Sequence, residues 1–388
     1  MTNFFHALQN LSMVIFYIIL LILALDYLFY KILALPFFLS RQFSILDGTL
    51  LGGKPVIPEN YQSDENTWFA GYINEAKAVF AHIQWRPYTY WASKQFKGNY
   101  INITSKGIRQ TLNYTSQDKN PIKIYMFGGS TMWGWGARDD YTIPSCVARC
   151  LYEKYGLIAE VVNFAELGYV STQEVICLFR ELQSENIPNF VINYDGLNDT
   201  FSSYQMKRAG LPQNEPNREL EFNCTKGQLF KRMIAMNSGF VSLRNFLSPN
   251  TDQAFIFKNK YQETTLINKT AKTYLNNLKM LNAVSQAYDY KLLAYWQPTI
   301  FDKNILTPNE KQMLESHKIW QDFYFQVKKN ILENADSLYF KDLSNSFNDI
   351  SFPVYIDPWH IDEKANEKIA TKIADDILTS LQVNKSNH

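Results

Sequence analysis

The feature that most constrains this chain is the alternation of short apolar runs with longer amphipathic segments from residue 121 onward. The apolar runs predict strands at Ile122–Phe127, Ala159–Phe164, Phe190–Tyr194, Tyr290–Trp296 and Ser337–Phe340. The segments between and after them predict helices at about Thr142–Tyr155, Thr172–Glu185, Lys272–Tyr288, Asn309–Glu333 and Asp362–Leu381. Strands that alternate with helices form right-handed βαβ units and a parallel sheet covered on both faces. We therefore expect a three-layer α/β/α sandwich.

Changes in pattern along the chain predict its organisation. We expect a main domain over residues 121–383, interrupted at about 201–265 by an insertion with several prolines and weak periodicity. Residues 41–120 are rich in Tyr, Trp, Asn and Lys, and they predict an extension packed on the main domain, with one helix around Asn66–His82. Residues 1–40 form a separate N-terminal segment.

Composition excludes several classes of protein. The 388 residues are 46% hydrophobic and 15% aromatic, which is typical of a packed globular protein rather than a disordered one. The 38 basic and 37 acidic residues leave a net charge of +1, so no excess of positive charge attracts nucleic acid. Four cysteines are too few for a disulfide framework, and the five scattered histidines form no zinc motif. We predict no metal, no cofactor and no nucleic-acid partner.

The N-terminal segment carries an apolar run. Leu11–Leu25 is interrupted only by Ser12, and the run resumes after Asp26 as far as Tyr30. Roughly 20 residues are needed to cross a bilayer core, a length that this run reaches when Asp26 is included near its end. No basic residue precedes the run and no small-residue cleavage site follows it, which favours an uncleaved anchor over a cleaved signal peptide or a buried core helix. We therefore predict a single N-terminal transmembrane helix.

Functional residues of an open parallel sheet lie on the loops that leave the carboxyl ends of its strands. The first predicted strand runs into Gly128-Gly129-Ser130, where glycines let the chain turn and expose the serine hydroxyl beside its own backbone N–H. The second strand is followed by Gly168, which can present a bare backbone N–H next to the first loop. Taken singly, each of these loops is more typical of an ordinary turn.

The third loop and the C-terminal turn supply an amide and a histidine. The third strand is followed by Asn198, whose carboxamide can donate to a developing oxyanion. Near the C-terminus, Asp357-Pro358-Trp359-His360 places a carboxylate close to a histidine on a rigid turn, which suits a base whose tautomer must be fixed. Turn residues and a structural histidine are the alternatives for these loops taken singly. The ordered set at one predicted sheet edge favours one shared site.

This ordered set resembles the SGNH hydrolases, also called the GDSL esterase and lipase family, whose four blocks carry Ser, Gly, Asn and His. The resemblance covers roughly Pro121–Leu381 and depends on FGGST, the glycine of ELGYVSTQE, GLND and DPWH. It is closest to the bacterial membrane-anchored branch, whose first block reads Gly-Gly-Ser-Thr instead of Gly-Asp-Ser. Gly107-Ile108-Arg109 and Gln297-Pro298-Thr299 are also similar to that branch. The expected sheet is therefore parallel and flavodoxin-like, preceded by the transmembrane helix.

The resemblance implies a role for each residue of the blocks. Ser130 is the implied nucleophile, His360 the general base and Asp357 the partner that orients His360. The backbone N–H groups of Ser130 and Gly168 and the side chain of Asn198 form the implied oxyanion hole. Gly129 replaces the aspartate of Gly-Asp-Ser, which is not a member of the triad.

These roles imply acyl transfer, and the residues leave three functions open. The first is a membrane-anchored esterase or deacylase that acts on acyl esters, including acetyl esters, of an envelope glycan or lipid. The second is an O-acyltransferase that modifies a surface polysaccharide with the same triad. The third, from another class, is a catalytically silent SGNH-like domain that binds glycan, which the retention of all four blocks disfavours.

Two further expectations concern the substrate and the location. Flat aromatic rings near the predicted catalytic edge can stack on sugars; they are Trp133, Trp135, Tyr169, Trp296 and Trp359. Because 15% of the chain is aromatic, we expect about half of these rings to be ordinary packing. Lys31, Arg41 and Lys54 follow the apolar run and by the positive-inside rule would keep the domain in the cytoplasm. Related anchored enzymes usually act on the other side, and we expect an extracytoplasmic catalytic domain.

Overall fold

The computed structural model describes residues 2–29, 58–62, 67–114, 121–213, 215, 257 and 259–386. The chain forms two compact units, one of Met1–Val56 with Asn214–Ile256 and the other of Ile57–Gln213 with Phe257–His388. In the first unit the described element is α1 (Thr2–Phe29), whose side chains are described at residues 13–25 and 27. The second unit holds every residue that the sequence predicts for the site.

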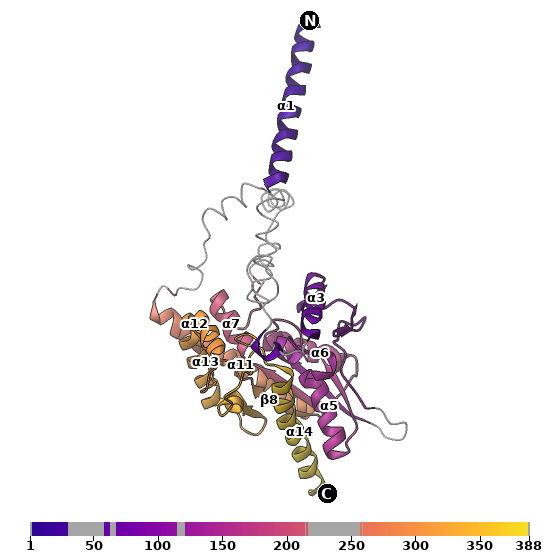
Figure 1. Cartoon of the computed structure of the whole chain (residues 1–388), viewed down its shortest axis with the longest axis vertical. Coiled ribbons are helices and arrows are strands. Elements are labelled where there is room, and N and C mark those ends of the chain that lie inside the picture. The colour runs from indigo at the N-terminus through magenta and orange to yellow at the C-terminus, as the bar shows by residue number, and fades with distance from the viewer. Residues whose placement is uncertain are drawn as a thin grey trace. The chain divides into compact units, whose positions relative to one another are not determined.

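A five-stranded parallel sheet forms the centre of the second unit, where β8 lies among the helices (Figure 1). Its strands are β5 (Ile122–Gly128), β6 (Ala159–Asn163), β7 (Phe190–Asp195), β8 (Lys291–Trp296) and β9 (Phe340–Asp342). They lie in the order β6-β5-β7-β8-β9, and each neighbouring pair is parallel. The predicted α/β class with a parallel sheet is confirmed, and the strand order is that of flavodoxin-like sheets.

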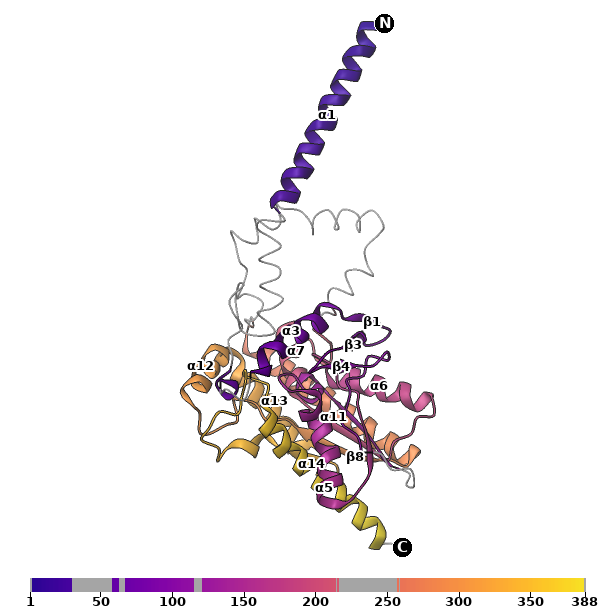
Figure 2. The same ribbon diagram turned by 45° about the vertical axis from the view of Figure 1, so that its right-hand side comes forward.

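Helices cover both faces of this sheet. Right-handed crossovers place α5 (Ile143–Tyr155) on one face, where it packs against α14 (Glu363–Ser386), as Figures 1 and 2 show. The same rule places α6 (Ser171–Gln183), α11 (Lys260–Tyr288) and α13 (Gln321–Asn334) on the other face, where α11 contacts both of the others. Because both faces are covered, every residue of β7 is buried.

Several element boundaries differ from those predicted. The helix predicted over Asn309–Glu333 is two helices, α12 (Pro308–His317) and α13, separated by a 3₁₀ turn at Lys318–Trp320 that buries the Trp320 side chain. α11 begins at Lys260, well before the predicted start, because the Asn259 side chain accepts a hydrogen bond from the Gln262 N–H and caps it. The burial of Trp320 sets the break between α12 and α13, and the Asn259 cap sets the start of α11. Apolar periodicity indicates neither boundary.

The residues before the sheet form small elements that contact its loops. They are a 3₁₀ turn (Glu59–Tyr61), α3 (Trp68–Ala81), and the hairpins β1 (Gln84–Arg86) with β2 (Tyr90–Ala92) and β3 (Phe96–Lys97) with β4 (Asn102–Ile103). Figure 2 shows α3, β1, β3 and β4 gathered together. Trp91 donates to the Leu167 carbonyl and Tyr61 to the Gly136 carbonyl, so these elements reach the loops after β6 and β5.

The predicted domain boundaries near residues 40 and 120, and most of the predicted insertion at 201–265, lie outside the described residues. These boundaries stay predictions. The predicted transmembrane helix is not found: in the part of the chain that the structure describes, no helix is both long enough and apolar enough to cross a membrane.

Candidate active site

Four predicted residues share a pattern of exposure. Ser130 follows β5, Gly168 follows β6, Asn198 follows β7, and His360 precedes α14. The first three are half-buried between buried neighbours in the sequence, and His360 is half-buried as well. Because β5, β6 and β7 are adjacent and parallel, their carboxyl ends present these residues at one edge, at the point where the strand order reverses.

A continuous chain of hydrogen bonds joins Ser130, His360 and Asp357. The Ser130 Oγ lies 2.6 Å from His360 Nε2, and His360 Nδ1 lies 2.6 Å from Asp357 Oδ2. With Nδ1 protonated toward the carboxylate, Nε2 is left to accept the serine proton. The structure therefore brings the three predicted side chains together in the arrangement that activates a serine nucleophile.

The turn that carries His360 holds the Asp357 carboxylate in the ionised form. Asp357 Oδ1 accepts hydrogen bonds from the backbone N–H groups of Trp359 and His360, each at 2.9 Å. Burial acts to raise the pKa of Asp357, but the nearby His360 ring and these hydrogen bonds outweigh it and hold the pKa below its usual value. Asp362 Oδ1 accepts from the Ala365 N–H and caps α14.

Asn198 lies against the backbone just before the serine. Its Nδ2 atom donates to the Tyr169 carbonyl at 2.8 Å, and a Cβ atom placed on Gly129 would lie 2.1 Å from that same nitrogen. The absence of a side chain at position 129 therefore makes room for the carboxamide of Asn198. This contact joins the loops after β5, β6 and β7.

Gly168 adopts a left-handed conformation with φ of +73°, which favours glycine. The elements before the sheet hold the turn on which it lies. Trp91 Nε1 donates to the Leu167 carbonyl at 2.8 Å, and the buried Glu166 carboxylate accepts from the N–H and hydroxyl of Ser93 at 2.6 and 2.8 Å. Sequence analysis did not assign a role to Trp91, Ser93 or Glu166, because their pairing depends on a hairpin distant in sequence.

Arg109, noted in the sequence without a role, supports the serine loop. Its fully buried guanidinium donates to the carbonyls of Trp133, Gly134 and Ala137 at 3.1, 2.6 and 2.6 Å. Its Nε atom also pairs with Asp139 at 2.9 Å. These bonds satisfy carbonyl groups at the end of the short helix α4 (Ser130–Trp133), which begins with the predicted nucleophile.

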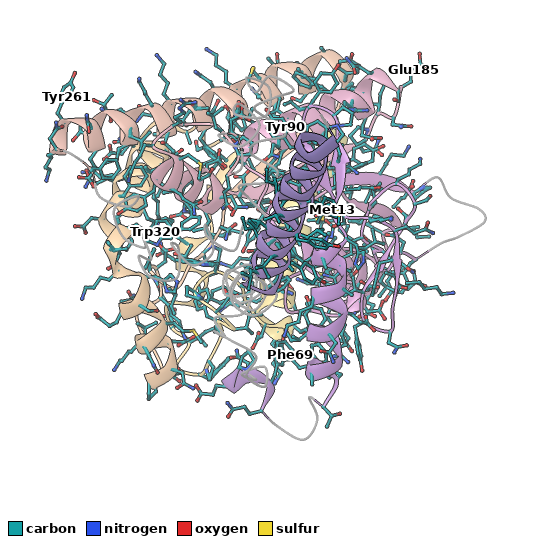
Figure 3. All side chains as sticks on the ribbon, turned by 90° about the horizontal axis from the view of Figure 1, so that it is seen from above. Met13, Phe69, Tyr90, Glu185, Tyr261 and Trp320 are labelled. Carbon is teal, nitrogen blue, oxygen red and sulfur yellow. The ribbon has the colours of Figure 1, made fainter. Side chains whose placement is uncertain are left out.

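Most of the aromatic residues predicted near the site are unable to meet a substrate. Trp133, Tyr169 and Trp296 have no measurable exposure and Trp135 is 6% exposed, so the expectation that they stack on sugar rings is wrong. Among the five, Trp359 is half-buried and keeps part of its ring exposed. Its ring contacts the rings of Phe201, Phe301, His317 and Trp320, the last a buried residue labelled in Figure 3.

Three carboxyl groups are buried behind the loop that carries Asn198. Burial raises the pKa of both Glu174 and Asp195, that of Asp195 to about 7, and the neighbouring Asp195 charge adds to the rise at Glu174. Burial raises the pKa of Asp199 to about 6, although hydrogen bonds from Ser171 oppose the shift. In the described residues no group of His, Cys, Asp and Glu side chains is arranged to hold a metal ion.

The similarity of this chain to known proteins is confined to solved structures. No family model matches the sequence, and no curated protein matches it. Solved structures with a similar arrangement include a lipase, Lip_vut3, from a goat rumen metagenome, with a TM-score of 0.39 and 11% identity over 65% of this chain and 95% of that one. The acetyl xylan esterase AlAXEase gives a TM-score of 0.37 and 14% identity over 67% and 99% of the two chains. The esterase EstA from Pseudoalteromonas gives a TM-score of 0.32 and 14% identity over the same shares.

Proposed function

We propose that this protein is a serine hydrolase of the SGNH type that cleaves acyl esters. The observation that carries the proposal is the chain of hydrogen bonds from Ser130 through His360 to Asp357, with both links at 2.6 Å. The proposal assigns the oxyanion hole to the N–H groups of Ser130 and Gly168 and to the Asn198 side chain. Their half-buried positions at one sheet edge support this assignment.

The reaction follows from these groups. His360 Nε2 takes the proton of Ser130 as its Oγ attacks the ester carbonyl, and the negative charge on the carbonyl oxygen is held by the oxyanion donors. His360 then gives that proton to the leaving alcohol, and an acyl-Ser130 ester remains. Water, deprotonated by His360, releases the acid and restores the serine.

Labelling with a fluorophosphonate probe tests this proposal. The reagent forms a covalent bond only with an activated serine, so we expect the full chain to be labelled and to hydrolyse p-nitrophenyl acetate. Ser130→Ala and His360→Ala should lose both properties, whereas Ser316→Ala, which changes a serine on α12 hydrogen-bonded to His317, should keep them. A folded wild-type protein that is neither labelled nor active would favour a glycan-binding domain instead.

We further propose an acyl ester of an envelope glycan or lipid as the substrate class, with acetyl as the smallest acyl group. Support comes from Trp359, which lies between Asp357 and His360 in the sequence and whose half-buried ring keeps a part exposed that can contact a sugar. Trp359→Ala should raise the KM for an acetylated oligosaccharide several-fold more than the KM for p-nitrophenyl acetate. Trp85→Ala, at an exposed position in β1, is the matched control and should change neither value. Product analysis with an added glycan acceptor separates hydrolysis from acyl transfer.

The location is also a proposal: the catalytic unit lies outside the cytoplasm, held at a membrane by the N-terminal segment. Its support is the resemblance of the four blocks to a membrane-anchored branch. An alkaline phosphatase fused to the C-terminus should be active in a bacterial host and a GFP fusion should be dark. The reverse pattern, or recovery of the protein in the soluble fraction, would contradict the proposal.

A further inference from the structure

The first turns of two helices meet behind the proposed oxyanion donors. α6 begins at Ser171, shortly after Gly168, and α7 (Leu197–Met206) carries Asn198 in its first turn. The Asp199 carboxylate joins the two helices. Its Oδ2 accepts from the Ser171 backbone N–H at 3.0 Å, and its Oδ1 accepts from the Ser171 hydroxyl at 2.6 Å.

The contact between Asp199 and Ser171 is buried, and a residue of a third helix, α11, also hydrogen-bonds to Ser171. Asp199 is 3% exposed and Ser171 is 2% exposed. The Ser171 hydroxyl donates its single proton to Asp199, and its oxygen accepts from Asn277 Nδ2 of α11 at 2.8 Å. Because each donor and acceptor in this chain has a partner, the hydroxyl is held in one orientation.

The Asp199 contact lies beside the one that Asn198 makes. Asn198 Nδ2 donates to the Tyr169 carbonyl. Asp199, the next residue, bonds to Ser171, two residues after Tyr169. The Asp199 carboxylate, which lies on α7, thus binds the first residue of α6. It fixes the loop after β6 relative to the loop after β7.

We propose that Asp199 is a positioning residue for the oxyanion hole. It holds the turn that carries Gly168 against the helix start that carries Asn198, so the two donors keep their spacing while charge develops on the substrate oxygen. Donors to an oxyanion act only within a narrow range of distance, and a displacement of about 1 Å costs roughly 100-fold in rate. This inference rests on the proposed function, because Gly168 and Asn198 are oxyanion donors only in that proposal.

The substitution Asp199→Asn tests the inference with little change in shape. The carboxamide keeps one acceptor oxygen, and its NH₂ group faces a donor of Ser171, so one of the two bonds is lost. We expect kcat for p-nitrophenyl acetate to fall at least tenfold while KM stays within about twofold, because the donor spacing matters most in the transition state. A kcat within twofold of the wild-type value would overturn the inference.

A double-mutant cycle separates positioning from a general structural effect. If Asp199 acts through the donors, Asp199→Asn should reduce kcat at least threefold less in an Asn198→Ala background than in the wild-type background. Equal reductions in the two backgrounds would overturn the inference. The matched control is Asp342→Asn at the end of β9, where the carboxylate accepts from the N–H and hydroxyl of Ser344, each at 2.9 Å. This variant should keep kcat within twofold.

Circular dichroism and thermal melting establish that each variant is folded. If Asp199→Asn does not fold, Ser171→Ala replaces it, since this change keeps the backbone N–H bond to Asp199 and removes the hydroxyl bonds to Asp199 and Asn277. We expect a kcat at least threefold lower with an unchanged KM, and an unchanged kcat would overturn the inference. An inactive, unlabelled wild-type protein would overturn the proposed function itself, whereas an active wild type with fully active variants would overturn only the role of Asp199.

Discussion

His360 Nε2 lies 2.6 Å from Ser130 Oγ, although the two residues are separated by 230 positions in the sequence. The strand order places Ser130 at the carboxyl end of β5, and the turn before α14 brings His360 to the same edge. The close contact leaves the serine proton directed at a nitrogen that can accept it. The orientation of that nitrogen depends in turn on the hydrogen bond between His360 Nδ1 and Asp357.

The orientation of His360 depends on the charge of Asp357. In Asp357→Asn, the Asn oxygen keeps the two backbone hydrogen bonds from Trp359 and His360, so its NH₂ group faces His360 Nδ1. The imidazole is then forced to carry its proton on Nε2 and is unable to accept from Ser130. We expect kcat to fall by about 10⁴-fold with folding unchanged, as for the equivalent change in other triads. Steady-state kinetics at several pH values measure this, and a loss under tenfold would contradict the assigned tautomer.

The Asn198 carboxamide should contribute mainly to the transition state. Removal of one oxyanion donor costs about 100-fold or more in kcat, so Asn198→Ala should show a loss of that size with little change in KM. The half-buried position of Asn198 predicts a small effect on stability, which thermal melting checks. An unchanged kcat would remove Asn198 from the oxyanion hole.

Gly129 should be sensitive to the addition of a single methyl group. Its φ of −85° is accessible to alanine, but the new Cβ would lie 2.1 Å from Asn198 Nδ2 and displace the carboxamide. We expect Gly129→Ala to lower kcat at least tenfold. The double variant Gly129→Ala/Asn198→Ala should be no slower than Asn198→Ala alone, and a further large loss would show that the methyl group acts on another residue.

The buried pair of Glu174 and Asp195 should make stability depend on pH. Glu174 Oε1 and Asp195 Oδ2 have no hydrogen-bond donor unless one of these carboxyl groups is protonated. Burial raises the pKa of both groups above the usual carboxyl values, and that of Asp195 to about 7. Because the folded pKa values exceed the unfolded ones, the stability from these groups is complete below about pH 4 and is lost as the pH rises toward 7.

Glu174→Gln should weaken this dependence. The Gln amide can donate to Asp195 at every pH while its oxygen accepts from Asn193 Nδ2, as Glu174 Oε2 does at 2.9 Å. Between pH 5 and pH 8 the melting temperature of the wild-type protein should fall more than that of the variant. Glu160→Gln, at an exposed position in β6, should keep the wild-type slope. If the melting temperatures of Glu174→Gln and the wild type fall equally with pH, the pair of Glu174 and Asp195 is not the source of the dependence.

Arg109 should matter more for stability than any exposed arginine. Its loss leaves Asp139 and three backbone carbonyl groups without their buried partner. We expect Arg109→Met to lower the free energy of unfolding by about 3–5 kcal/mol, the usual effect of breaking a buried ion pair from one side. Urea denaturation measures the change. Arg180→Met, on the exposed face of α6, is the control and should stay within about 0.5 kcal/mol.

The parts of the site that could be predicted from the sequence are local. Asp357 and His360 lie on one short turn, so their pairing follows from their spacing. The ends of the first three strands could be found from their apolar runs, and this located Ser130, Gly168 and Asn198 on adjacent loops. The last strand lies at Phe340–Asp342, beyond most of the predicted Ser337–Phe340 run. The contact between Asp199 and Ser171 was not predicted, because it joins two loops that are distant in the sequence. The sequence pointed to it only through the carboxylate that directly follows Asn198.

The sequence by itself determined the α/β class, the strands of the parallel sheet and the loops that carry polar side chains, because apolar periodicity and glycine turns act over a few residues. The tertiary structure alone decided which side chains meet. It buried Trp133 and Trp296 and left part of the Trp359 ring exposed. It also brought Arg109 to the end of α4, since contacts between distant segments depend on packing of the whole unit rather than on neighbours in the chain.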